Sequence, residues 1–129
     1  MSCIFAVISA LSIYALAGVD KKNNNLITLT DDNFGKEIKN DIVIVDFWAV
    51  WCGPCQRQGP IIEDLAIELK KRARVGKLDI DKNQMVADLY QVTNIPTIII
   101  FKKGKPAKRF VGLTTREEII QAIELIEKQ

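Results

Sequence analysis

From residue 26 onward the chain alternates between short apolar runs and longer segments with one apolar face. Runs rich in β-branched residues are typical of strands, and they occur at Leu26–Leu29, Ile42–Ala49, Val75–Ile80, Thr97–Phe101 and Lys108–Val111. The second run is nearly continuously apolar, as in a central strand that is buried on both faces. The last two runs flank a Lys-Lys-Gly-Lys turn and therefore predict a β-hairpin.

Helical patterns fill the intervals between these runs. The apolar spacing predicts helices over about 31–39, from after Cys52 to about Arg72, over about 83–90, and from Thr114 or Thr115 toward the C-terminus. Thr30 can cap the first helix, and a glutamate three residues after either threonine completes a capping-box pattern at the last one. This order of elements predicts an α/β domain with a central mixed sheet and helices on both faces.

The first 25 residues have a different character. Residues 1–19 carry no charged side chain, and residues 20–25 are polar. We expect 1–19 to be an apolar leader (a signal peptide or membrane anchor), 20–25 a linker and 26–129 the folded domain. A soluble core helix or a misplaced start codon is the alternative for 1–19. The Ala-Leu-Ala sequence at 15–17 resembles a signal-peptidase site, whereas two lysines at 21–22 favour a cytoplasmic flank for an uncleaved anchor. The expected location is extracytoplasmic or membrane-associated, and a cytoplasmic protein is the alternative.

Composition excludes several kinds of function. Against 16 Asp+Glu the chain has 18 Lys+Arg, a net charge of +2, which is too balanced to indicate nucleic acid as a partner. There is no histidine, which excludes Ser-His-Asp and Cys-His catalytic arrangements and histidine metal sites. The chain has only three cysteines, whereas a structural zinc site normally takes four Cys or His ligands. No metal is therefore expected.

The strongest chemical signal is the pair Cys52 and Cys55, which directly follows the predicted central strand and opens a helix. The spacing places both sulfurs on the first helical turn, close enough to form a small disulfide ring. Cys52 then lies at the positive end of the helix, which favours the thiolate. Pro54 suits an early helical position that needs no N–H, and Gly53 leaves the sulfur uncrowded. A purely structural disulfide is the alternative, although so small a ring constrains little of the chain.

The sequence around this pair resembles the thioredoxin family. The resemblance rests on VDFWAVWCGPC at 45–55, Pro60, KLDID at 77–81, IPT at 95–97, FKKG at 101–104 and VG at 111–112. It extends from about Leu26 to the C-terminus. The resemblance implies a thioredoxin fold and a thiol–disulfide oxidoreductase that reduces protein disulfides through a mixed disulfide. It implies no cofactor besides the dithiol itself.

The same resemblance implies roles for four residues. Cys52 corresponds to the solvent-facing thiolate that attacks the client disulfide, and Cys55 to the more buried thiol that resolves the mixed disulfide. Asp46 corresponds to a carboxylate that takes or relays the proton of the resolving cysteine, with help from Lys77. A carboxylate within an apolar strand is costly to bury, and burial is expected to raise the pKa of Asp46. A surface-facing Asp46 is the alternative.

A substrate-binding rim is implied around the cysteines. The Ile-Pro dipeptide at 95–96 matches the family's cis-proline site, where the backbone of residue 95 can pair with an extended client strand. Ile95, together with Gly-Pro between the cysteines, resembles the reducing members. The rim residues are Trp51, Gly53, Pro54, Ile95, Pro96, Val111, Gly112 and Leu113. The pattern leaves open whether Val111 and Leu113 belong to the rim or to the core, and Trp48 is assigned to the core.

The expected function is that of a protein-disulfide reductase. Its partners are disulfide-containing client proteins and a thioredoxin reductase or a membrane electron donor, with possible membrane association through residues 1–19. A dedicated extracytoplasmic or membrane-tethered reductant with few clients is a second interpretation. A non-catalytic binding module on the same fold is a third, and the intact set of Cys52, Cys55 and Asp46 argues against it.

Overall fold

The computed structural model describes residues 25–129. The predicted leader, 1–19, and residues 20–24 of the predicted linker lie outside the described residues. Within 25–129 no helix is long and apolar enough to cross a membrane.

The described chain alternates strands and helices in the predicted order. The elements are β1 (Leu26–Leu29), α2 (Phe34–Glu37), β2 (Ile42–Trp48), α3 (Gly53–Glu68), β3 (Arg74–Asp79), α4 (Gln84–Leu89), β4 (Thr97–Lys102), β5 (Lys105–Val111) and α5 (Arg116–Glu127).

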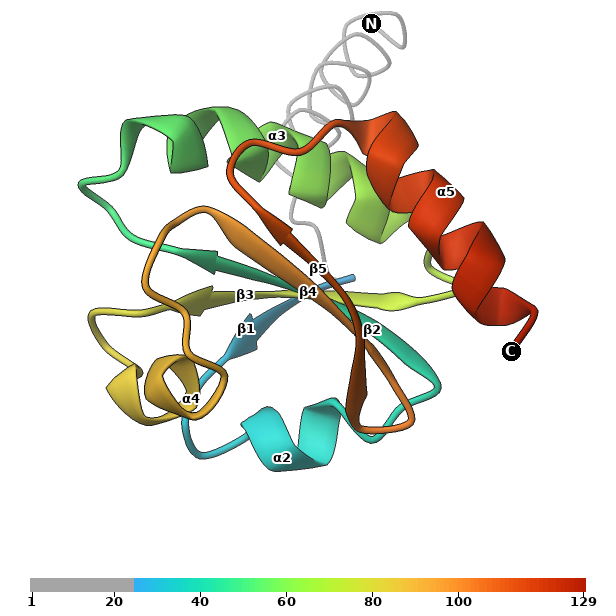
Figure 1. Ribbon diagram of the computed structural model, residues 1–129, viewed down its shortest axis with the longest axis horizontal. Coiled ribbons are helices and arrows are strands. Elements are labelled where there is room, and N and C mark those ends of the chain that lie inside the picture. Colours follow the sequence, from blue (N-terminus) through green and yellow to red (C-terminus); the bar gives the residue numbers. More distant parts are fainter. Residues whose placement is uncertain (1–24) are drawn as a thin grey trace, which may run out of the picture.

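The strands form one mixed sheet in the order β1-β3-β2-β4-β5. Strand β3 is parallel to both β1 and β2, whereas β4 is antiparallel to both β2 and β5. Helices α3 and α5 lie on one face of the sheet, and α2 and α4 lie on the other (Figure 1). The predicted mixed sheet with helices on both faces is confirmed.

Strand β2 divides the core into two layers because successive side chains of a strand point to opposite faces. Ile42 and Ile44 pack in the layer under α3 and α5. Val43, Val45 and Phe47 pack in the layer against α2 and α4. The alternation therefore directs the side chain of residue 46 to the face covered by α3, the helix that opens at the cysteine pair.

Two helices are shorter than predicted. Helix α2 begins at Phe34. Just before it Thr30 and Asn33 bind each other's backbone: Asn33 Oδ1 accepts the Thr30 N–H at 2.7 Å, and Thr30 Oγ1 accepts the Asn33 N–H at 3.2 Å. Helix α3 ends at Glu68 instead of near residue 72. The Leu69 carbonyl accepts the N–H groups of residues 72 and 73 at 2.7 and 2.8 Å, which turns the chain toward β3.

The hairpin strand β5 begins at Lys105, three residues before its predicted start. Lys103 and Gly104 both have positive φ, 50° and 83°, and form the two-residue turn that suits the twist of a hairpin. Pro106 is accommodated because β5 is an edge strand. At the last helix the capping box is formed by Thr115 and Glu118, which settles the choice between the two predicted cap positions.

Candidate active site

Cys52 and Cys55 lie at the N-terminal end of α3 and are joined by a disulfide. Cys52 is the N-cap residue, with extended backbone, and its Sγ accepts the N–H of Cys55 at 3.2 Å. Pro54 occupies the first helical turn, where its missing N–H leaves no hydrogen bond unmade. The Cys52 sulfur is thus held at the positive end of the helix, where a negative charge is favoured.

The two cysteines are almost equally buried. Cys52 is 5% exposed and Cys55 is 3% exposed, so the solvent-facing Cys52 expected from the resemblance is not seen in the disulfide form. The carbonyl oxygen of Ile95 lies 3.7 Å from Cys52 Sγ and covers it. The hydrogen bond at the helix N-terminus, more than exposure, distinguishes the two sulfurs.

The segment opposite the disulfide contains a cis peptide bond between Ile95 and Pro96, as the resemblance implied. Pro96 is buried and Ile95 is half-buried. Gly112, with φ of 94°, donates its N–H to the Pro96 carbonyl at 2.8 Å. Its neighbours Val111 and Leu113 are 61% and 49% exposed. This exposure favours the rim over the core for both residues.

On the other side of the disulfide, Trp51, Gly53 and Pro54 are exposed. Trp51 is 69% exposed, and its indole N–H donates to Asp81 Oδ2 at 2.8 Å. Asp81 lies just beyond β3 and is not among the site residues predicted from the sequence. The bond orients a large apolar ring that remains open to solvent beside the cysteines.

Asp46 is fully buried, and within the described residues no group donates a hydrogen bond to either carboxylate oxygen. Burial raises the pKa of this carboxyl from 3.8 to about 7, although the positive charge of Lys77 opposes the rise. The alternative of a surface-facing Asp46 is wrong. The carboxyl can therefore gain or lose a proton near neutral pH.

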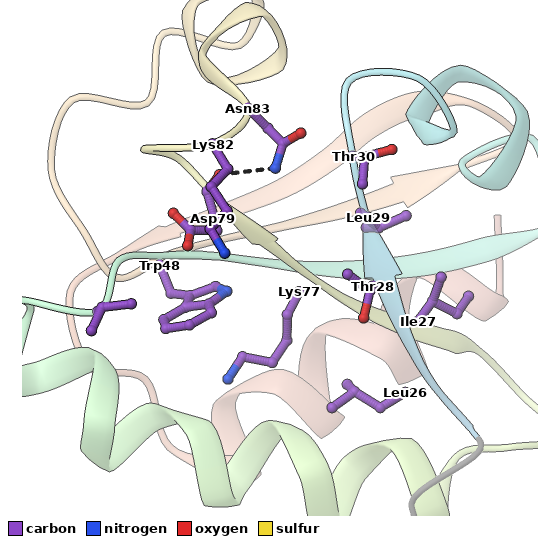
Figure 2. Close-up of a pocket in the computed structure, with 11 residues that line it drawn as sticks. Leu26, Ile27, Thr28, Leu29, Thr30, Trp48, Lys77, Asp79, Lys82 and Asn83 are labelled. Carbon is purple, nitrogen blue, oxygen red and sulfur yellow. Dashed lines mark hydrogen bonds between the residues drawn. The ribbon is translucent and has the colours of Figure 1, made fainter.

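Lys77 is the register partner of Asp46 on the adjacent strand. Its Nζ lies 4.5 Å from the centroid of the Trp48 ring, within the range of a cation–π interaction. Figure 2 shows the side chain running from β3 toward α3 beside that ring. It borders a cavity of about 350 Å³ along β1. Trp48, at the end of the strand that carries Asp46, also lines this cavity.

Removing the charge of Lys77 is expected to raise the pKa of Asp46 further, because Lys77 is the group that opposes the effect of burial. A carbon-13 NMR titration of the Asp46 carboxyl in a Lys77→Met variant measures this shift. Lys77→Arg, which keeps the charge, is the matched control and should leave the midpoint closer to that of the unaltered protein. An unchanged or lowered midpoint in Lys77→Met would contradict the coupling.

A buried polar contact that the sequence analysis missed lies behind the rim. Gln58 is fully buried, and its side-chain amide pairs with both backbone groups of Thr114. A signal was present in the sequence. Gln58 follows Cys55 by three residues and precedes Ile62 by four. This spacing places Gln58 on the inward face of the helix.

The potential metal ligands do not cluster in the described part of the chain. No group of three or more Cys, Asp or Glu side chains there is arranged to hold a metal ion. The disulfide is the redox-capable feature of the site.

Comparison with known proteins identifies the family of this chain. The family model for thioredoxin matches residues 25–125. The chain belongs to the thioredoxin family. A thioredoxin of Staphylococcus saprophyticus is 40% identical over 99 residues, which cover 77% of this chain and 95% of that protein. A thioredoxin of Staphylococcus aureus is 37% identical over 99 residues, with the same coverage.

Family and geometry together establish the activity class. This thioredoxin-family chain is a thiol–disulfide oxidoreductase, and its redox group is the Cys52–Cys55 pair without a further cofactor. The predicted thioredoxin fold is confirmed. Family membership also indicates disulfide-containing clients and a reductase as partners.

Proposed function

We propose that the reduced pair passes two electrons to the disulfides of client proteins, with Cys52 as the attacking thiolate and Cys55 as the resolving thiol. The observation that carries this assignment is the hydrogen bond from the Cys55 N–H to Cys52 Sγ at 3.2 Å. This bond and the end of α3 both favour negative charge on Cys52. Cys55 lies three residues further into the helix.

The exchange has two steps. Cys52 Sγ attacks one sulfur of the client disulfide, forming a mixed disulfide, and the other client sulfur leaves as a thiolate. Cys55 then loses its proton and attacks Cys52 Sγ, which forms the Cys52–Cys55 disulfide and releases the second client thiolate. The client gains two electrons, the dithiol loses two, and a reductase regenerates the dithiol.

Asp46 is proposed to accept the proton that Cys55 loses. It lies on the sheet face covered by α3, and its pKa of about 7 suits proton exchange at neutral pH. Lys77 stabilises the carboxylate that remains once the proton has been passed on.

The client is proposed to bind as an extended segment across the rim. The backbone of Ile95 lies beside Cys52 and offers main-chain hydrogen bonds to such a segment. The exposed side chains of Trp51, Val111 and Leu113 provide apolar contacts on both sides of the disulfide. This arrangement recognises backbone and general apolarity, so it suits a broad range of clients.

Reduction of insulin by dithiothreitol, followed by turbidity, tests the proposed function. The chain should accelerate the reaction at catalytic concentration, and the double variant Cys52→Ser/Cys55→Ser should not. A non-catalytic binding module would leave the uncatalysed rate unchanged, and that result would overturn the proposal.

From the sequence of residues 1–19 alone, we further propose that the domain works outside the cytoplasm or at a membrane, supplied by a membrane electron donor. The uncharged apolar run and the Ala-Leu-Ala site support this location. Fractionation with protease protection and sequencing of the mature N-terminus should show cleavage near residue 17 or a membrane-bound chain. Recovery of the full chain from the cytosol, beginning at Met1, would contradict it.

A further inference from the structure

A buried amide ties helix α3 to the segment that forms one wall of the rim. Gln58 Nε2 donates to the Thr114 carbonyl at 3.0 Å, and Gln58 Oε1 accepts the Thr114 N–H at 2.8 Å. Gln58 is fully buried and Thr114 is 3% exposed. In Figure 1 the chain that leaves β5 passes beside α3 before α5 begins. The two residues are 56 positions apart in the sequence, so this contact is tertiary.

The contact continues toward the active site through two more hydrogen bonds. Thr114 Oγ1 donates to the Gly112 carbonyl at 2.9 Å. The Gly112 N–H in turn donates to the Pro96 carbonyl at 2.8 Å, and the Ile95 carbonyl lies against Cys52 Sγ. A continuous series of hydrogen bonds thus links α3, the segment 111–114 (the rim segment) and the cis-proline segment.

We propose that Gln58 is a positioning residue for client proteins: it fixes the rim segment relative to α3 and thereby sets the geometry in which a protein disulfide reaches Cys52. This inference rests on the proposed function and deepens it, because it names the residue that holds the client-binding surface in place. Gln58 takes no part in the reaction at the sulfurs themselves.

The hydrogen bonds between Gln58 and Thr114 favour a role in positioning the rim segment over a role in packing alone. A buried side-chain amide is tolerated only when its polar groups are paired. Here the amide nitrogen of Gln58 donates to the Thr114 carbonyl and the amide oxygen accepts the Thr114 N–H. The two bonds together define the distance and the orientation of Thr114. An apolar side chain of similar length fills the same volume but imposes neither constraint, and it leaves the Thr114 N–H and carbonyl without partners.

Protein disulfides and small disulfides should respond differently to a change at Gln58. A protein disulfide must contact the rim segment through Val111 and Leu113, whereas a small disulfide such as dithiobis(nitrobenzoate) reaches Cys52 without those contacts. Disturbing the rim segment should therefore weaken the reaction with proteins and spare the reaction with small disulfides.

The experiment compares Gln58→Met with the unaltered protein on both substrates. We expect kcat/KM for insulin to fall about tenfold, chiefly through a higher KM. The rate constant with dithiobis(nitrobenzoate) should change by less than about twofold. Gln121→Met, the same exchange at an exposed position of α5, is the matched control and should change neither value.

A second pair of variants keeps the proposal testable if Gln58→Met fails to fold. Thr114→Val retains the shape but removes the hydroxyl that donates to Gly112, and Thr114→Ser retains the hydroxyl. Thr114→Val should raise KM for insulin more than Thr114→Ser does, again without affecting the small disulfide.

Equal losses on both substrates, or none on either, would overturn the positioning role. These results are distinguishable from failure of the proposed function, in which the unaltered protein itself would reduce neither disulfide.

Discussion

The Cys55→Ser variant is expected to accumulate mixed disulfides with client proteins, whereas Cys52→Ser should form none and lose at least about a thousandfold in reduction rate. Cys52 Sγ occupies the N-cap and accepts the Cys55 N–H, so it is the sulfur on which a thiolate is stabilised. Without Cys55, Cys52 still forms the mixed disulfide with the client, but no thiol is available to resolve it.

Non-reducing electrophoresis and mass spectrometry of the adducts measure this asymmetry. Both variants should be made in a Cys3→Ser background, because the third cysteine of the sequence offers another thiol for adventitious exchange. The double variant Cys52→Ser/Cys55→Ser is the control for non-covalent capture. Equal trapping by the two single variants would contradict the assignment of nucleophile and resolver.

The Asp46→Asn variant is expected to be more stable than the unaltered protein at pH 8, by roughly 2–4 kcal/mol. Burial raises the pKa of Asp46 from 3.8 to about 7, so between these two pH values the folded state binds a proton that the unfolded state has released. The stability of the unaltered protein therefore falls as the pH rises through this window. Asparagine does not titrate and removes this dependence.

Urea unfolding at pH 4 and pH 8 measures the difference. At pH 4 the carboxyl is largely protonated in the folded state, so the two proteins should be similar in stability. The gap should open on going to pH 8, and a gap that is the same at both pH values would show that ionisation of Asp46 is not its source.

The same variant should reduce client disulfides more slowly, because it lacks the group proposed to accept the Cys55 proton. The loss should be seen between about pH 6 and 8, where the carboxylate form of Asp46 becomes populated. Rates of insulin reduction that match those of the unaltered protein across this range would exclude the proton-transfer role, whatever the effect on stability.

Much of the fold was predictable from local pattern. The apolar run in β2 fixed its central position, and the capping residues marked the start of α5. The lengths of α2 and α3 were not predictable, because they depend on specific contacts. The Thr30–Asn33 pair holds the turn that precedes the first helix, and after the second helix the Leu69 carbonyl accepts two N–H groups as the chain turns toward β3.

The candidate site was predictable to the extent that its residues lie in motifs. The cysteine pair and Asp46 follow from their sequence context, whereas the Ile-Pro dipeptide was identified through the family resemblance. The near-equal burial of the two cysteines and the contact between Gln58 and Thr114 depend on how α3 packs against distant segments. Periodicity places Gln58 on the inward face of α3, but only the tertiary structure supplies its partner.

A single turnover without added reductant shows whether Cys52 and Cys55 supply the two electrons that reduce a client disulfide. The reduced chain is mixed with an excess of a protein that contains one disulfide, quenched with acid and analysed by peptide mapping. We expect each client disulfide that is reduced to be matched by one new Cys52–Cys55 disulfide, with Cys3 still a thiol. Client reduction without formation of that disulfide, or with the electrons drawn from Cys3, would contradict this expectation.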